Sequence, residues 1–334
     1  MDECWGAGKE PRLCLCERIV VKMNQQNHTK ESWLQKTVVI WLGAMLCCAL
    51  WGSASPCIKL SYAMLQIDAA DTAAQILFAG IRFTIAGVLT ILIGSVLAGQ
   101  FLCPKGGAWL RVTKLSLLQT VLQYYFFYVG LAHTTGVKAS IIIAINVFVA
   151  ILVASLIYHQ ETLTVPKIIG CIIGFSGVML INMSGMNFQM SLLGEGFIMC
   201  STVAYAFSSV YIKRYSVTDH PVMLSGYQFL VGGIIMVVIG AIMGGRISVI
   251  TSSGIAMLLY LAMVSAVAYS IWGILLKYNP VSRVAVFNFM NPVCGVILST
   301  ILLKESPQAS GATSLVALVL VCVGIYVVNR GEKK

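Results

Sequence analysis

The sequence predicts an all-helical membrane protein with ten transmembrane helices, built as two inverted five-helix repeats. Three observations predict this fold class. The chain is 58% hydrophobic and only 10% charged, and its mean hydropathy of +0.88 is far above the average of soluble domains. Its apolar runs reach the ~20 residues that cross ~30 Å of hydrocarbon. The second half of the chain also repeats the first.

Ten apolar stretches meet the length requirement. They are expected at 38–64, 74–98, 113–133, 137–158, 166–184, 193–213, 222–243, 254–276, 283–303 and 311–329. Residues 38–184 form the first repeat and 193–329 the second, with tails at 1–37 and 330–334. Met23 is an alternative start, in which case residues 1–22 are a misassigned extension. Because the connections are short, no soluble domain with its own core is expected.

The basic residues predict the orientation. Seventeen of the 22 lie in segments on the same side of the membrane as the N-terminus, and one, Arg82, lies within a span. The other four are Lys59, Lys138, Arg246 and Lys304. Because cytoplasmic loops carry the excess of lysine and arginine, both termini are expected in the cytoplasm, with the protein in the cytoplasmic membrane. The same distribution explains the net charge of +10 without a nucleic-acid partner.

The repeat is visible by self-comparison. The segment "LWGSASPCIKL" in span 1 matches "AYAFSSVYIKR" in span 6, and "RFTIAG" in span 2 matches "QFLVGG" in span 7, which aligns Arg82 with Gln228. Tyr125 aligns with Tyr269, and Glu161 with Glu305. Since five is odd, the second copy enters the membrane from the opposite side. Inverted repeats are typical of secondary transporters, which hold their solute near the midplane between the halves.

The same residues carry a family resemblance. "LWGSASPCIK" with "GIRFTIAG", the stretch ending at Glu161 and the stretch "VFNFMNPVCGVILSTILLKES" ending at Glu305 resemble the drug/metabolite transporter superfamily, and within it the ten-span EamA-type exporters. The resemblance covers roughly residues 38–329. The family's proline in the fourth span of each repeat is present as Pro292, but Phe148 occupies the matching position of the first half. A kink is therefore predicted for span 9, while span 4 lacks this signal.

Polar and aromatic residues inside the spans are candidates to line a solute cavity, because lipid-facing positions disfavour them. Packing between helices is the alternative for each one. The candidates are Trp51, Ser55, Tyr124, Tyr128, Asn146, Tyr205, Tyr269, Trp272 and Asn291. Asn288 is a weaker candidate. Ser55 together with Pro56 also indicates a kink in span 1, with simple tolerance of the proline as the alternative.

Arg82 and Lys59 are the candidate cationic site residues. A charge near the bilayer centre costs roughly 2.5–3.5 kcal/mol even on lenient scales, and no acidic residue is expected at that depth. We therefore predict that Arg82, with Lys59 as a second candidate, binds a carboxylate or other anionic group of the solute. The alternative is that Arg82 extends to the outer interface and has no role in binding.

Other patterns narrow the function. "GCIIG" at 170–174 and "GAIMG" at 240–244 permit close helix packing, with a homodimer face as the alternative. Glu161 and Glu305 are expected to hydrogen-bond loops. No phosphate-binding loop, zinc motif or cofactor motif is present, and none of the acidic residues lies mid-span, which argues against exchange of cations for protons. The sequence therefore predicts a secondary exporter of small metabolites, with amino acids or related compounds as the leading class. An intramembrane enzyme or a receptor remains the alternative.

Overall fold

The computed structural model describes residues 33–68, 70–134, 136–181, 191–303 and 311–330. Their helices follow the ten predicted spans in order. Spans 1 and 2 are α2 (Thr37–Leu65) and α3 (Thr72–Ala98), span 3 is α4 (Ala108–Leu115), η1 (Ser116–Leu122) and α5 (Gln123–Ala132), span 4 is α6 (Gly136–Ala144), α7 (Asn146–Leu152) and η2 (Val153–Ile157), and span 5 is α8 (Val165–Ile181). Span 6 is η4 (Leu192–Gly196) and α9 (Phe197–Tyr215), spans 7 and 8 are α10 (Pro221–Ile242) and α11 (Ser252–Tyr278), span 9 is α12 (Val281–Ala285), η5 (Val286–Phe289) and α13 (Met290–Leu303), and span 10 is α14 (Gly311–Arg330).

Within the described ranges, five helices are individually long and apolar enough to cross a membrane. The others are shorter because the span is built from consecutive pieces. Local chemistry sets several of the boundaries. The Asp71 carboxylate accepts a hydrogen bond from the amide of Ala74 at the start of α3, and Thr251 caps α11 in the same way through Gly254. Gly99 adopts a left-handed conformation (φ +64°) that ends α3.

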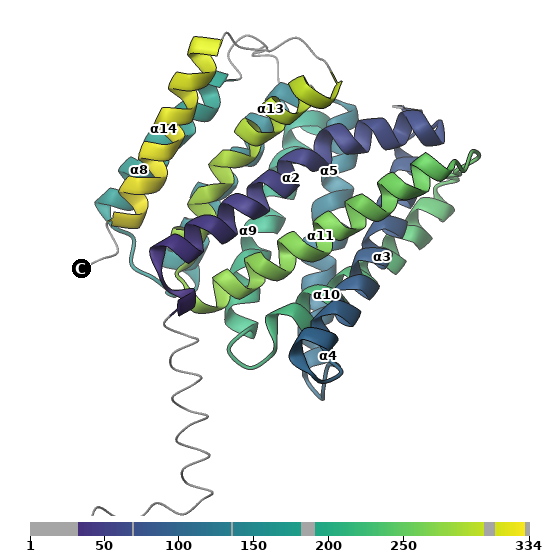
Figure 1. The fold of residues 1–334 in the computed structure, drawn as a ribbon, viewed down its shortest axis with the longest axis horizontal. Coiled ribbons are helices and arrows are strands. Elements are labelled where there is room, and N and C mark those ends of the chain that lie inside the picture. Colours follow the sequence, from purple (N-terminus) through teal and green to yellow (C-terminus); the bar gives the residue numbers. More distant parts are fainter. Residues whose placement is uncertain (1–32, 69, 135, 182–190, 304–310, 331–334) are drawn as a thin grey trace, which may run out of the picture.

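Each half packs on the other through the equivalent spans. Span 1 (α2) packs on spans 8 and 9 through α11 and α13, and span 6 (α9) packs on spans 3 and 4 through α5 and α7. Spans 2 and 7 (α3 and α10) pair with each other at one side of the bundle, and spans 5 and 10 (α8 and α14) pair at the other (Figure 1). Swapping the halves converts each set of contacts into the other. This packing is what two copies of one five-helix unit produce around a pseudo-twofold axis.

Glycines bring the paired helices into contact. A Cβ atom on Gly80 would lie 2.5 Å from the backbone nitrogen of Val237, and one on Gly233 would lie 2.5 Å from that of Thr84, so α3 and α10 touch through their backbones. The predicted packing role of the "GCIIG" pattern is confirmed, because a Cβ on Gly324 of α14 would lie 2.6 Å from the carbonyl oxygen of Gly170. Since this approach joins helices of one chain, the pattern gives no support to a homodimer face. In "GAIMG" only the first glycine packs, and Gly244 (φ +86°) follows the end of α10.

The helix interruptions agree with expectation in span 9 and differ from it in spans 1 and 4. Span 9 breaks at η5, a 3₁₀ turn that ends just before Pro292. Span 4 breaks at Ile145, between α6 and α7, although Phe148 stands where the proline would be. A proline is therefore not required for the break. Conversely, α2 continues as one helix through Pro56, and the side chain of Ser55 lies outside the described residues.

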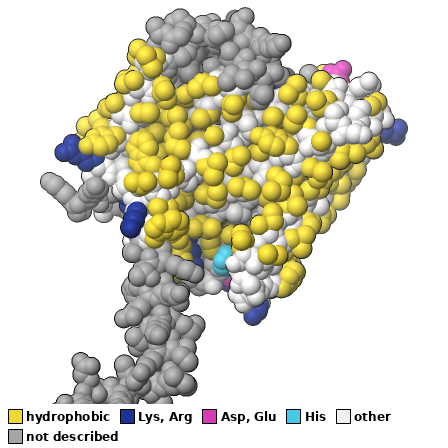
Figure 2. Space-filling view, in the orientation of Figure 1, with side chains coloured by type: hydrophobic (Ala, Val, Ile, Leu, Met, Phe, Trp, Pro, Cys, Tyr) yellow, Lys and Arg dark blue, Asp and Glu magenta, His cyan; other side chains and the backbone are white. Residues whose placement is uncertain are grey.

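The surface matches a lipid environment. Hydrophobic side chains cover most of the face in Figure 2, and lysines and arginines lie at its margins. Many large apolar residues are exposed on the described surface, among them Leu92, Val96, Ile172 and Val238. Such exposure is unfavourable in water and expected against acyl chains.

Candidate functional site

Four aromatic rings form a closed quartet where the two halves meet. Phe83 of α3 stacks on Phe229 of α10, with ring centroids 5.2 Å apart. Phe83 also contacts Tyr124 of α5 at 4.4 Å, and Phe229 contacts Tyr269 of α11 at 4.8 Å. The hydroxyls of Tyr124 and Tyr269 are 2.9 Å apart and complete the ring. Each half contributes one phenylalanine and one tyrosine, so the quartet surrounds the pseudo-twofold axis.

Two tryptophans extend this layer toward α2. The Trp51 ring lies 5.1 Å from that of Tyr269 and 5.0 Å from that of Trp272, both in edge-on contact. The indole nitrogens of Trp51 and Trp272 are buried and have no hydrogen-bond partner among the described residues. A buried indole N–H normally has an acceptor. These two donors are therefore suited to a polar group of a bound solute.

Arg82 lies inside the protein at mid-depth. Its side chain is only 3% exposed, and its Nη2 donates to Ser265 Oγ at 2.8 Å. Ser265 lies in the middle of α11 (Ser252–Tyr278). The guanidinium carbon also stands 5.0 Å from the centroid of the Phe83 ring. The alternative in which Arg82 extends to the interface is therefore wrong for this conformation.

Tyrosines of the same layer lie near the Arg82 guanidinium. Tyr124 contacts the Phe83 ring, which lies 5.0 Å from the guanidinium carbon, and Tyr128 lies next to Tyr124, with ring centroids 6.3 Å apart. Tyr62 and Tyr128 lie beside each other. The cation is thus bordered by neutral hydroxyls and aromatic faces.

Gln228, which aligns with Arg82 in the repeat, makes the equivalent contact in the other half. Gln228 is fully buried, and its Nε2 donates to Oε1 of Gln119, also fully buried, at 2.6 Å. Arg82 and Ser265 join spans 2 and 8, whereas Gln228 and Gln119 join spans 7 and 3. The pseudo-twofold axis exchanges these pairs of spans. One half therefore holds a cation where the other holds a neutral amide pair.

Asparagines lie at the interruptions of spans 4 and 9. The Asn288 amide lies within reach of the Tyr205 hydroxyl, and its oxygen accepts from Asn291 Nδ2 at 3.4 Å. Asn288 Nδ2, Asn291 Oδ1 and Asn146 Oδ1 are buried and have no partner within the described part of the chain. Since Tyr205 also lies near Tyr124, Asn288 and Asn291 continue the polar layer from the aromatic quartet toward α13.

The structure brings together most of the predicted site residues. Trp51, Arg82, Tyr124, Tyr128, Tyr205, Tyr269, Trp272 and Asn291 belong to this central layer. Asn146 is buried at the corresponding break of span 4. Lys59 differs, because its side chain is exposed on α2 rather than buried as that of Arg82 is.

Sequence reasoning missed Tyr62, Ser265 and Gln119, and it gave Asn288, which hydrogen-bonds Asn291, as a weaker candidate. Gln119 could have been found as the span 3 glutamine able to pair with Gln228. No signal marked Ser265, because a serine in a membrane helix is common and bonds its own turn, as Ser265 does to Leu261.

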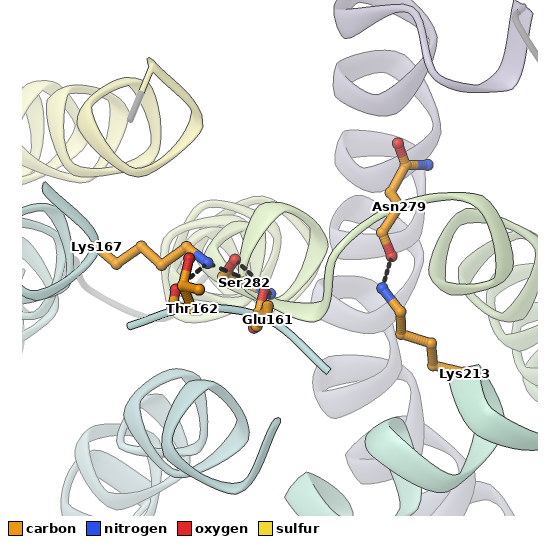
Figure 3. Close-up of polar contacts among 6 residues, drawn as sticks. All are labelled: Glu161, Thr162, Lys167, Lys213, Asn279 and Ser282. Carbon is orange, nitrogen blue, oxygen red and sulfur yellow. Dashed lines mark hydrogen bonds and ion pairs between the residues drawn. The ribbon is translucent and has the colours of Figure 1, made fainter. Parts of the chain in front are cut away.

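A second polar cluster ties the halves together at one end of the bundle (Figure 3). Glu161 Oε2 accepts from Lys167 Nζ at 3.1 Å and from Ser282 Oγ at 2.6 Å, and Glu161 Oε1 accepts from the Ser282 amide at 3.1 Å. Lys213 donates to the backbone carbonyl of Asn279, just before α12. Glu161 belongs to the first half and Ser282 to the second. We call Glu161, Lys167 and Ser282 the Glu161 clasp.

The clasp lies at the end of the bundle where α2 begins and α14 ends. Arg283, next to Ser282, donates to Thr37 Oγ1 at the start of α2 and to Asn329 Oδ1 near the end of α14. Glu161 was expected to hydrogen-bond a loop, but its partners lie in helices, Ser282 at the start of α12 and Lys167 in α8. Glu305, its repeat counterpart, lies outside the described residues.

Fold and site together define a membrane transporter of the inverted-repeat kind. The family model for the EamA-like transporter family matches residues 38–183 and again 192–330. The chain therefore belongs to the EamA-like transporter family, within the drug/metabolite transporter superfamily, and is a transporter rather than an enzyme.

Relatives agree with this assignment. The chain is 27% identical over 263 residues to the "Uncharacterized transporter YvbV" of Bacillus subtilis, covering 77% of this chain and 83% of that protein. It is 25% identical over 287 residues to the "Uncharacterized inner membrane transporter YedA" of Escherichia coli, covering 83% and 88%. A solved crystal structure superposes with a TM-score of 0.71 at 17% identity, covering 90% of this chain and all of the other. That last likeness shows the fold alone.

Proposed function

We propose that this protein is a secondary transporter that exports small metabolites by alternating access, with amino acids or related compounds as the leading solute class. The observation that carries the proposal is the buried polar and aromatic layer between two halves that exchange equivalent contacts. A solute held in this layer can be presented to either side when the halves rock against each other around the site. Trp51, Tyr205, Trp272 and Asn291 then contact the solute.

The Glu161 clasp fits this mechanism. It joins residues of opposite halves at one end of the bundle, so it must separate for the site to open at that end. With both termini in the cytoplasm, as proposed, this is the cytoplasmic end, and the described conformation is closed toward the cytoplasm. The relative YedA is described as an inner membrane transporter, which supports the cytoplasmic membrane as the location.

Export is tested by comparing metabolites. Cells that overexpress the chain should release one or more small metabolites in excess of cells that carry the empty vector. Purified protein in proteoliposomes should then move the same compound down its gradient without ATP. Alternating access is tested with a variant that carries Glu161→Cys and Ser282→Cys. Joining the two cysteines with a short, cleavable bifunctional cross-linker should stop transport until the linker is cleaved. Transport that continues at full rate with the clasp locked would contradict alternating access.

Orientation is tested by cysteine labelling. Cysteines introduced near Lys105 and Gly331 should react only from the cytoplasm, and those near Asp68 and Gly185 only from outside. Reaction of the last pair from the same side as the first would refute the inverted topology.

The coupling proposal follows from the acidic residues. Those of the described chain are Asp68, Asp71, Glu161, Glu195 and Asp219, all at span ends or in loops. Exchange of a lipophilic cation for protons needs a carboxylate within the membrane that binds either one. Purified protein should therefore show no proton-driven ethidium efflux, and robust efflux of that kind would refute the proposal.

A further inference from the structure

The inference concerns Arg82, the buried cation beside the aromatic quartet, and it rests on the proposed function. Asp71, which caps the start of α3, is eleven residues before Arg82, or about 16 Å along the helix at 1.5 Å per residue. The other acidic residues of the described chain also lie at span ends or in loops. The guanidinium donates a hydrogen bond to a neutral hydroxyl, Ser265 Oγ. Its Nε is buried and has no partner within the described ranges.

A buried charge of this kind is costly unless it is paired. One explanation is that the fold needs the arginine for packing. The repeat provides an internal control for this explanation. At the pseudo-equivalent position Gln228 is buried to the same degree, is followed by the equivalent phenylalanine, and bonds the equivalent span of the other half. The same packing is therefore achieved with a neutral amide, and the fold does not require a cation here.

The surroundings of the guanidinium fit a ligand. Tyr124 contacts the same Phe83 ring as the guanidinium, and Tyr128 lies next to Tyr124. Tyrosine hydroxyls can donate to an anion as well as accept from arginine. The Phe83 ring lies 5.0 Å from the guanidinium carbon, a cation–π contact that uses none of its N–H donors. Trp51 and Tyr269 provide an apolar wall next to this polar corner. Arginine with adjacent hydroxyls is the donor set that binds a carboxylate.

We propose that Arg82 and Ser265, with the hydroxyls of Tyr124 and Tyr128, form the receptor for the carboxylate of an organic solute whose apolar body rests on the Trp51 and Tyr269 rings. The bound carboxylate supplies the missing counter-charge. Gln228 and Gln119 form the neutral counterpart on the other side of the axis. The site is thus symmetric in shape and asymmetric in charge, and it selects solutes with one anionic end.

The test uses thermal unfolding of the purified chain in detergent, with benzoate as probe and the isosteric neutral benzamide as control. Benzoate should raise the melting temperature of the wild type in a concentration-dependent manner, and benzamide should not. Arg82→Gln should melt at the same temperature as the wild type or higher without probe, because an unpaired buried charge has been removed, and its response to benzoate should be lost. Arg82→Lys keeps the charge without the planar fork and should respond more weakly.

The pseudo-symmetry of the two repeats allows a rescue of the benzoate response. Combining Arg82→Gln with Gln228→Arg transfers the cation to the pseudo-equivalent position, and part of the benzoate response should return. A lowered melting temperature or loss of folded protein in Arg82→Gln would show that the arginine is structural and would overturn the proposal. Equal responses to benzoate and benzamide, or no wild-type response to benzoate, would also overturn it. A wild type that responds to benzoate but transports nothing in proteoliposomes would leave the anion site intact and refute the proposed function.

Discussion

Replacing Glu161 by glutamine should loosen the end of the bundle where α2 begins far more than removing the more exposed ion pair between Arg111 and Asp219. The side chains of Lys167 and Glu161 are only 2% and 5% exposed. Removing one partner of a buried pair costs about 3–5 kcal/mol, because the other charge stays buried. The matched control is Asp219→Asn; the Asp219 side chain is 10% exposed and that of its partner Arg111 is 31% exposed. Because the Arg111 guanidinium reaches water, loss of this pair costs less, about 1 kcal/mol.

The assay uses the thiol of Cys48 as a reporter. Cys48 is fully buried, and its Sγ donates to the carbonyl oxygen of Phe287, in the turn that follows α12. Since Glu161 binds the start of α12 through Ser282, releasing it should free this turn and expose the thiol. At ~1.4 kcal/mol per factor of ten, the labelling rate of a variant with Cys48 as its single cysteine should rise roughly 10²-fold or more for Glu161→Gln. It should rise less than tenfold for Asp219→Asn. Equal rates in the two variants would refute the idea that burial gives the clasp its strength.

Two further predictions concern the interface between the halves. Gly87→Ala should sharply reduce the yield of folded protein, because its Cβ would collide with the backbone of Leu230. Gly295→Ala is the control and should be tolerated, because the nearest atom to its Cβ is 3.9 Å away. Similar thermal stability of the two variants would contradict the close approach of α3 and α10. A double-mutant cycle with Tyr124→Phe and Tyr269→Phe should give a coupling energy of about 0.5–1.5 kcal/mol in thermal unfolding, since each change alone breaks the same hydrogen bond, and strictly additive effects would show that the bond contributes nothing.

The sequence was sufficient for the number, order and approximate limits of the spans, because crossing a bilayer requires long apolar runs. It was not sufficient for the interior of the spans. The π-helical turns of η1 and η2 and the 3₁₀ turn of η5 change the residues per turn without changing hydropathy. A consequence is visible at the centre. Self-comparison aligned Tyr125 with Tyr269, whereas the ring that meets Tyr269 belongs to Tyr124, which follows the wider turns of η1.

The central residues were predictable by type and not by contact. Amides and aromatic rings inside spans marked a polar layer, and Trp51, Tyr124 and Tyr269 proved to lie in it. Ser265 could not be selected from sequence, since its role depends on which helix faces Arg82. The depth of Arg82 was also open, because the apolar run around it permitted both an interfacial and a central position. The packing of α3 against α10 and α11 decides between them.

Comparison of the two repeats separates residues that the fold requires from residues that it tolerates. Positions that keep their type in both halves, such as Gly80 with Gly226 and Phe83 with Phe229, are those where the helices touch at the axis. Positions that differ are not needed for packing. Pro292 is one example, because span 4 breaks at the equivalent place without a proline. Arg82 is the other, because Gln228 occupies the same environment without a charge. A proline that is unnecessary costs the fold little, but an unnecessary buried cation is expensive, and that cost is the physical reason to seek its purpose in the solute rather than in the fold.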